Sequence, residues 1–245
     1  MSRIWTILAS VLLLAGPARA APLVADLSDH LVAITAGFAG ADVLMFGAVE
    51  EPGDVVMIVK GPSERVSMHR KSWVGGIWIN TATMTFKEVP SFYAIASSRP
   101  LDEIASETLL ARHEMGVDRL KLELPRGKAS PNLAQEWRRA LVRNKQRDGL
   151  YSAEVAKISF LGDRLFRSRV QFPANVPTGT YRVDVFLLKD NRVISAQTTP
   201  LIISKIGVQA DIFDFAHEQS ALYGIIAIFV ALMAGWLAHV AFRKR

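Results

Sequence analysis

The stretch PTGTYRVDVFLLKDNRVISAQTTPLIISK, residues 177–205, has the pattern of two β-strands joined by a tight turn. In its first strand every second residue is apolar, which is typical of a strand with one buried face; these residues are Tyr181, Val183, Val185 and Leu187. Asp190 and Asn191 favour a turn, and the run RVISAQ then returns. The stretch therefore predicts a long hairpin near the end of a β-rich domain.

The rest of the chain supplies further short strands separated by Gly, Pro and acidic residues. Apolar, β-branched runs occur at 31–35, 42–49, 54–60 and 91–98. At 165–172, apolar side chains alternate with Arg167, Arg169 and Gln171, which indicates a half-buried strand with a cationic outer face. Many short strands and a closing Pro–Gly–Tyr hairpin predict a mainly β protein with an immunoglobulin-like β-sandwich. The pattern leaves open whether the two β-rich halves form one sandwich or two.

A helical segment at about 101–147 interrupts the strands. Residues 101–114 have apolar side chains at helical spacing, with Gly116 as the expected carboxyl-terminal cap. Ser130 and Pro131 predict the start of a second helix, which continues to 147. One face of this helix is apolar, as expected for packing on a core; it consists of Leu133, Trp137, Ala140 and Leu141. The other face is basic and suits either solvent or a lipid surface.

Residues 221–242 contain no Asp, Glu, Lys or Arg. As a helix this run is roughly 33 Å long, which matches a hydrocarbon core of roughly 30 Å. It therefore predicts a transmembrane helix rather than a buried helix of a soluble domain. Arg243, Lys244 and Arg245 follow at once, and the positive-inside rule places such a cationic tail in the cytoplasm.

Residues 1–20 have the three-part pattern of a secretory signal peptide. Arg3 precedes an apolar core, and Ala18-Arg19-Ala20 is a small-x-small cleavage signal; an uncleaved amino-terminal anchor is the alternative. We expect a periplasmic ectodomain at 21–206, a juxtamembrane linker at 207–220, and the cytoplasmic tail at 243–245. These boundaries predict a single-pass protein of the bacterial inner membrane.

The net charge of +6 does not indicate a nucleic-acid partner. The signal sequence contributes +2 and the tail +3, so residues 21–242 carry only +1. The chain has no cysteine, which excludes disulfides, thiolate metal sites and Cys nucleophiles. The basic excess thus belongs to targeting and topology.

The sequence motifs of common enzyme classes are absent. The chain has no Walker loop, dinucleotide fingerprint, Gly-x-Ser-x-Gly or His-Glu-x-x-His motif. The five histidines include no pair spaced four residues apart, so we expect no metal site and no cofactor. A site assembled from distant segments remains the alternative that spacing does not address.

The stretch HRKSWVGGIWIN, residues 69–80, is the strongest candidate for ligand binding. Gly75-Gly76 predicts a two-residue hairpin turn, with Arg70 and Lys71 close to Trp73 and Trp78. Cations beside indole rings can hold a small oxyanion. An edge hairpin protected by cations and closed by packed tryptophans is the structural alternative.

The predicted span carries a small-residue face. Ala227, Ala231 and Gly235 recur every four residues and so align on one side of a helix. Small residues let transmembrane helices approach closely. This face predicts packing against a partner helix or a second copy.

The segments GIWIN (76–80), SFYAIASSRPL (91–101) and GADVLMFGAV (40–49), with the single terminal span, resemble an uncharacterised family of alphaproteobacterial transmembrane proteins. The resemblance covers essentially the whole mature chain and carries no catalytic residues. It implies an accessory role beside an inner-membrane permease of the sulfite-exporter type, because genes of the family often neighbour such permeases. Since the enzyme motifs are absent, we expect this role to be non-enzymatic. A tethered oxyanion-binding module and an enzyme with an unfamiliar site are the alternatives.

Overall fold

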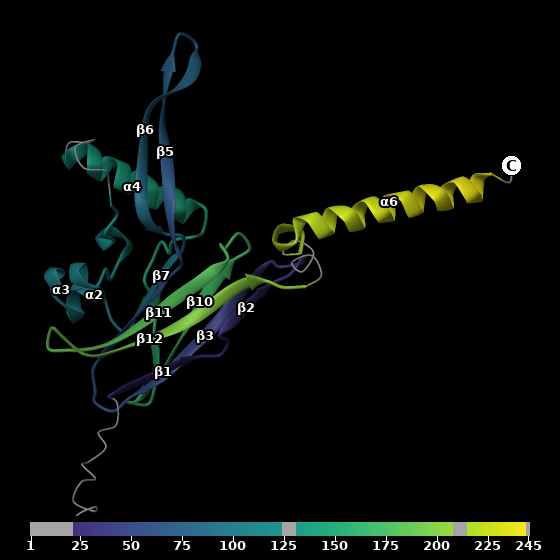
Figure 1. The fold of residues 1–245 in the computed structure, drawn as a ribbon. Coiled ribbons are helices and arrows are strands. Elements are labelled where there is room, and N and C mark those ends of the chain that lie inside the picture. The colour runs from purple at the N-terminus through teal and green to yellow at the C-terminus, as the bar shows by residue number, and fades with distance from the viewer. Residues whose placement is uncertain (1–21, 124–130, 208–214, 244–245) are drawn as a thin grey trace, which may run out of the picture.

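Two β-sheets pack face to face in the computed structural model, which describes residues 22–123, 131–207 and 215–243 (Figure 1). The first sheet has the strand order β1 (Leu23–Leu27), β3 (Gly40–Val49), β10 (Leu165–Pro173), β9 (Ser159–Leu161). The second has the order β2 (Leu31–Ile34), β12 (Arg192–Lys205), β11 (Gly179–Lys189), β4 (Asp54–Lys60), β7 (Tyr93–Ser97), β8 (Ala156–Lys157). Both β-rich halves of the sequence contribute to each sheet, so they form one sandwich.

The strand order matches that of an immunoglobulin sandwich. In that fold one sheet has the order A-B-E-D and the other contains C-F-G, which correspond here to β1-β3-β10-β9 and to β4-β11-β12. All of these neighbours pair antiparallel, whereas β2 joins the edge of β12 in parallel. The prediction of a mainly β fold is therefore confirmed, and the strand order is consistent with its immunoglobulin-like form.

Strand β4 is buried on both faces. Val55, Val56, Met57, Ile58 and Val59 are each at most 1% exposed, as expected for an apolar run without alternation. The first sheet covers one face. The helical segment covers the other, because the ring of His113 lies 5.2 Å from Phe186, the cross-strand neighbour of Val56.

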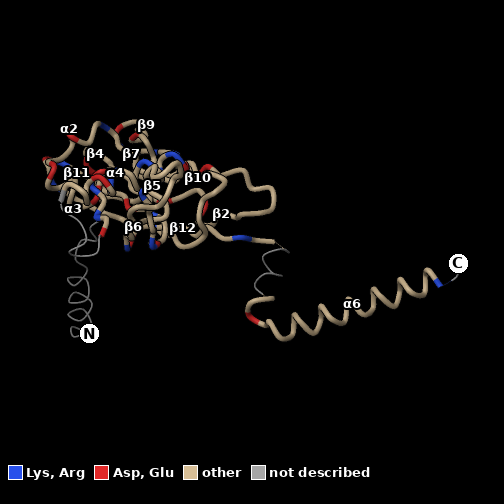
Figure 2. The backbone as a smooth tube through the Cα atoms, turned by 90° about the horizontal axis from the view of Figure 1, so that it is seen from above, with Lys and Arg blue, Asp and Glu red and all other residues tan. Residues whose placement is uncertain are grey.

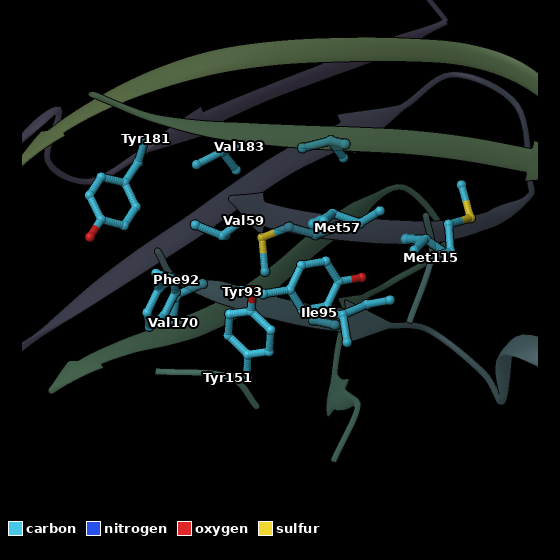
Figure 3. Packing of buried hydrophobic residues seen from close by; sticks show 14 of the residues in the cluster. Met57, Val59, Phe92, Tyr93, Ile95, Met115, Tyr151, Val170, Tyr181 and Val183 are labelled. Carbon is cyan, nitrogen blue, oxygen red and sulfur yellow. The ribbon is translucent and has the colours of Figure 1, made fainter. Parts of the chain in front are cut away.

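Aromatic rings connect the two sheets at one end of the sandwich. Phe172 of β10 lies 5.7 Å, edge to face, from Tyr181 of β11, and Phe92 lies 5.0 Å from Phe172. Figure 3 shows Phe92 and Val170 beside Tyr93 and Tyr151 in this core. Edge-to-face rings at such distances add to the stabilisation from buried area.

The helical segment differs in part from its prediction. The expected helix at 101–114 is two short helices, α2 (Leu101–Ile104) and α3 (Glu107–Arg112), because Ala105 between them is extended. The expected cap at Gly116 was also wrong. Glu114 takes the left-handed conformation that ends the segment, at φ 55°, and Gly116 starts the 3-10 turn η1 (Val117–Arg119). Helix α4 (Pro131–Arg147) has its predicted range, and Trp137 and Leu141 are buried.

Apart from the helical segment, a hairpin and the terminal helix extend away from the two sheets in Figure 1. The hairpin of β5 (Ser63–Val74) and β6 (Ile77–Pro90) projects from the chain between β4 and β7, alongside α4. Helix α6 (Ser220–Phe242) is the carboxyl-terminal apolar helix. The predicted signal peptide at 1–20, the cap Ser130, residues 208–214 of the linker, and Lys244 and Arg245 lie outside the described residues.

Both predicted tight turns are confirmed. Gly75 and Gly76 have φ of 59° and 89°, and Asp190 and Asn191 have φ of 49° and 59°. Two consecutive residues with positive φ are characteristic of type I′ hairpins. Tyr181 stabilises the backbone at the start of the β11–β12 hairpin, because its hydroxyl donates to the Pro177 carbonyl at 2.6 Å.

This Tyr181 contact resembles the tyrosine corner of immunoglobulin-like domains, in which a hydroxyl bonds to backbone a few residues upstream. Burial raises the pKa of Tyr181 to about 12, so the hydroxyl remains a donor at neutral pH. We expect Tyr181→Phe to lower the free energy of unfolding by about 1–2 kcal/mol, because the Pro177 carbonyl loses its partner. Thermal unfolding of the full chain in detergent measures the effect. Tyr223→Phe, at an exposed tyrosine of α6, is the control, and an equal loss in both variants would contradict this role.

Candidate functional site

The β5–β6 hairpin has a buried base and an exposed end. Met68, Met84 and Phe86 are buried near the sandwich, where the hairpin packs into the common core. From this base outward, pairs of hydroxyl and imidazole groups bridge the strands: Ser67 with Thr85, His69 with Thr83, and Ser72 with Thr81, at 2.9–3.0 Å. The stem is therefore polar above its base.

Helix α4 braces this stem through two ion pairs. Lys145 donates to the Glu64 carboxylate and to the Ser91 carbonyl. Arg70 Nη2 lies 2.8 Å from Glu136 Oε2, and the Arg70 guanidinium carbon lies 5.2 Å from the ring centre of Trp137. Lys145 is buried, and an ionised side chain in such a place needs its partner. The hairpin is thus fixed at two levels to the same helix.

The hairpin tip, residues Trp73–Ile79, is apolar and exposed. Trp73 and Trp78 are cross-strand partners, with ring centres 5.4 Å apart and planes at 69°. Val74, Ile77 and Ile79 lie beside them and are also exposed. The Trp pair closes the end of the hairpin by edge-to-face contact.

The structure brings together only part of the predicted anion site at Arg70, Lys71, Trp73 and Trp78. Lys71 pairs with Asn80 across the strands, one position behind the Trp73–Trp78 pair on the same face. Arg70 instead contacts Glu136 and Trp137, which were not linked to it by sequence spacing. A carboxylate therefore already occupies the guanidinium that was expected to receive an anion.

A second ion pair lies under the helical segment. Lys60 contacts Glu114, whose other oxygen accepts from the Lys121 amide at 3.0 Å. The hydroxyl of Tyr93 donates to the Glu114 carbonyl and accepts from the Gly116 amide. Burial alone would raise the pKa of the Glu114 carboxyl, but the hydrogen bonds from Lys60 and Lys121 outweigh it and hold that pKa below its usual range. This cluster fastens the loop after α3 to β4 and β7.

A cleft of about 760 Å³ opens at the edge of the sandwich between β10 and β7. Small side chains form much of its wall, so no motif in the sequence indicates it; they are Ala39, Ala41, Ala94, Ala96 and Ala156. Asp42, Arg169 and Gln171 supply its charged and polar lining. Its volume falls within the range of small-molecule sites.

No group of three or more His, Cys, Asp or Glu side chains suited to a metal ion occurs within residues 22–123, 131–207 and 215–243. The ion pairs Lys145–Glu64, Arg70–Glu136 and Lys60–Glu114 each join two packed elements. These ion pairs hold the sandwich, the helical segment and the hairpin together.

Helix α6 is long and apolar enough to cross a bilayer, with a mean hydropathy of 2.3 and none of that stretch buried. Figure 2 shows no Lys, Arg, Asp or Glu between its ends. Ala227, Ala231 and Gly235 are exposed on it, and Arg243 follows as its carboxyl-terminal cap.

These features agree with a family comparison that matches residues 22–244. The chain belongs to the family described as "Putative transmembrane protein (Alph_Pro_TM)". The predicted resemblance is thereby confirmed, and α6 places the chain in contact with a lipid bilayer. No curated protein matches the chain.

The Lys60–Glu114 pair gives a prediction about pH. Because the pKa of Glu114 is lowered on folding, its contribution to stability is present above the unfolded pKa of about 4.3. It is lost as the pH falls through the lower folded value. We expect Glu114→Gln to reduce the free energy of unfolding by about 2–3 kcal/mol at neutral pH, because Lys60 loses its counter-charge.

The gap in melting temperature between the native chain and Glu114→Gln should be constant near neutral pH and shrink below about pH 4.3. Thermal unfolding across this range measures the gap. Glu154→Gln removes a carboxylate from an exposed position and should leave the melting temperature unchanged. A gap for Glu114→Gln that persists undiminished into acid would contradict the assignment.

Proposed function

We propose that this protein is a non-enzymatic accessory module, anchored in the bacterial inner membrane with its sandwich in the periplasm. Its partner is an inner-membrane permease, of the sulfite-exporter type implied by the family resemblance. The observation that carries the proposal is α6, a membrane-spanning helix with no buried residue. A span that no other part of the described residues covers can pack against another membrane protein.

The small-residue face of α6 supplies the contact in this proposal. Ala227, Ala231 and Gly235 follow at intervals of four residues, and no side chain of the described chain covers them. Van der Waals packing at such faces is a main source of helix association in lipid. Orientation follows from the cationic residues after the helix, which favour the cytoplasmic side.

Crosslinked co-purification from native membranes tests this proposal. The full chain is compared with a variant whose residues 221–242 are replaced by leucine, and captured proteins are identified by mass spectrometry. We expect a permease to be enriched with the native span and lost with the leucine span, because leucine prevents close backbone approach.

Two other results of that experiment are informative. A permease that is retained by the leucine span would assign recognition to the ectodomain instead of α6. If neither chain enriches a membrane protein, the accessory function is wrong.

A tethered binding module for a small oxyanion is the second candidate, and the cleft beside β10 favours it. Arg169 lines the cleft and makes no ion pair with any residue of the described chain. A guanidinium without a carboxylate partner is suited to a sulfate or sulfonate group. Arg70, in contrast, is paired with Glu136.

For this second candidate we expect sulfite, sulfate or an organosulfonate to raise the melting temperature of the full chain in detergent, as ligands of the folded state do. Arg169→Ala should abolish the rise. Arg167→Ala is the matched control, because Arg167 is also exposed on β10 but lies outside the cleft. No rise with any of these anions, or an equal loss in both variants, would exclude the cleft as an anion site.

A further inference from the structure

The hairpin tip is apolar on both of its faces. Trp73 and Trp78 share one face, and Val74 and Ile77 share the other, because side chains alternate along a strand. Trp73 is 59% exposed, and Ile77 and Trp78 are each 64% exposed. A strand that packs on its own domain needs only one apolar face, so the second face requires another explanation.

The position of the tip rules out cover from its own sandwich. The hairpin projects beyond the sheets and beyond α4 in Figure 1. About seven residues separate the buried Met68 from the turn, which corresponds to roughly 23 Å of strand. A second copy of the hairpin, laid against this one, would cover a single face and leave the other in water.

We propose that the hairpin tip inserts into the headgroup region of the bilayer that α6 spans. A lipid interface surrounds an inserted loop on all sides, so it covers both apolar faces at once. Tryptophan is enriched at this depth because its ring is apolar while its N–H can still find a partner. The two tryptophans flank the turn symmetrically, as a pair of interfacial anchors would.

The charges behind the tip suit phospholipid. From Arg65 to Phe86 the sequence contains no Asp or Glu, and Lys71 lies just behind the apolar residues. Arg70 next to it is paired with Glu136 of α4. Lys71 is exposed on the same face as Trp73. An ammonium group at this level can donate to phosphate oxygens, which both zwitterionic and anionic phospholipids carry.

The turn limits the depth of insertion. Gly75 and Gly76 place peptide groups at the end of the hairpin, and unpaired peptide groups are costly inside hydrocarbon. The tip should therefore stop near the boundary between headgroups and acyl chains, as interfacial amphipathic segments do. Lipid contact at this depth leaves the turn hydrated.

Because α6 anchors the chain in the bilayer, even a weak affinity of the tip for lipid is enough to keep the tip inserted. α6 holds the chain to the same bilayer, so tip insertion becomes an intramolecular step with a high effective concentration. The 14 residues between Lys205 and Ser220 include the helical residues 215–218, so they reach less than the roughly 46–50 Å of a fully extended chain of that length. The ion pairs to α4 keep the stem rigid, so little conformational entropy is lost when the tip inserts.

The absence of cysteine allows a direct test on the full chain in phospholipid nanodiscs. An environment-sensitive fluorophore is attached to Ile77→Cys at the tip, or to Ile194→Cys on β12 as the control. Both positions are exposed isoleucines, and α6 holds both variants to the bilayer. Nitroxide lipids carry the quencher either near the headgroup or near the end of the acyl chain.

We expect the Ile77 label to lose most of its emission with the shallow quencher and much less with the deep one. The Ile194 label should keep its emission with both. Adding Trp73→Ser and Trp78→Ser should restore the emission of the Ile77 label, while an unchanged melting temperature shows that the domain is folded.

Quenching of the Ile77 label that does not exceed that of the Ile194 label would overturn the proposal. A blue-shifted Ile77 label that neither lipid quenches would also overturn it and would assign the tip to a protein partner. These results are independent of permease capture, so failure of the accessory function leaves the lipid contact standing.

Discussion

Burial of β4 on both faces is the constraint on which the other parts depend. A strand of five consecutive apolar residues at most 1% exposed needs a layer on each side, and a two-sheet sandwich supplies only one. The helical segment supplies the other, with His113 against Phe186 and Glu114 bonded to Lys60. The helices are therefore structural components of the sandwich. Because α4 contacts η1 at the end of this layer, it lies where it can brace the hairpin that leaves the end of β4.

The contacts with α4 hold the β5–β6 hairpin in a fixed position where it projects from the domain. An isolated two-stranded hairpin is marginally stable in water, yet β5 and β6 extend well beyond the sheets. Three contacts compensate for this: the buried base at Met68 and Met84, the Lys145–Glu64 pair, and the Arg70 contact with Glu136 and Trp137. The guanidinium of Arg70 thus has a structural use, and the ring that it contacts is Trp137 of α4. The sequence motif that was predicted to form one anion site therefore has two separate parts: Arg70, which braces the stem, and the exposed tryptophan pair at the tip.

Local sequence patterns predicted the elements better than their partners. Both type I′ turns, α4 and the buried alternation at Phe166, Val170 and Phe172 could be read from residue type and spacing, because these features depend on near neighbours. The pairing of β10 with β3, more than 100 residues apart, and the Arg70–Glu136 contact depend on tertiary folding and left no local trace. The break at Ala105 could not be predicted either, since both short helices present apolar residues in a continuous helical period. The cleft beside β10 is lined by alanines, which carry no chemical signature in a sequence.

Helix α6 and the hairpin tip are both apolar, but their backbones differ in how their hydrogen bonds are satisfied, and this difference explains their residue composition. α6 satisfies its own backbone by helical hydrogen bonds, so it can cross hydrocarbon completely and needs only an uncharged surface. A hairpin has peptide groups at its turn and along its strand edges that no neighbour pairs, so it can reach only a hydrated boundary. Tryptophan, lysine and asparagine near the tip suit that boundary, whereas leucine, isoleucine and alanine fill the span. With one element through the bilayer and a second resting on it, rotation of the sandwich about a single tether would be restricted. A defined face of the domain would then be held toward any protein that packs against α6.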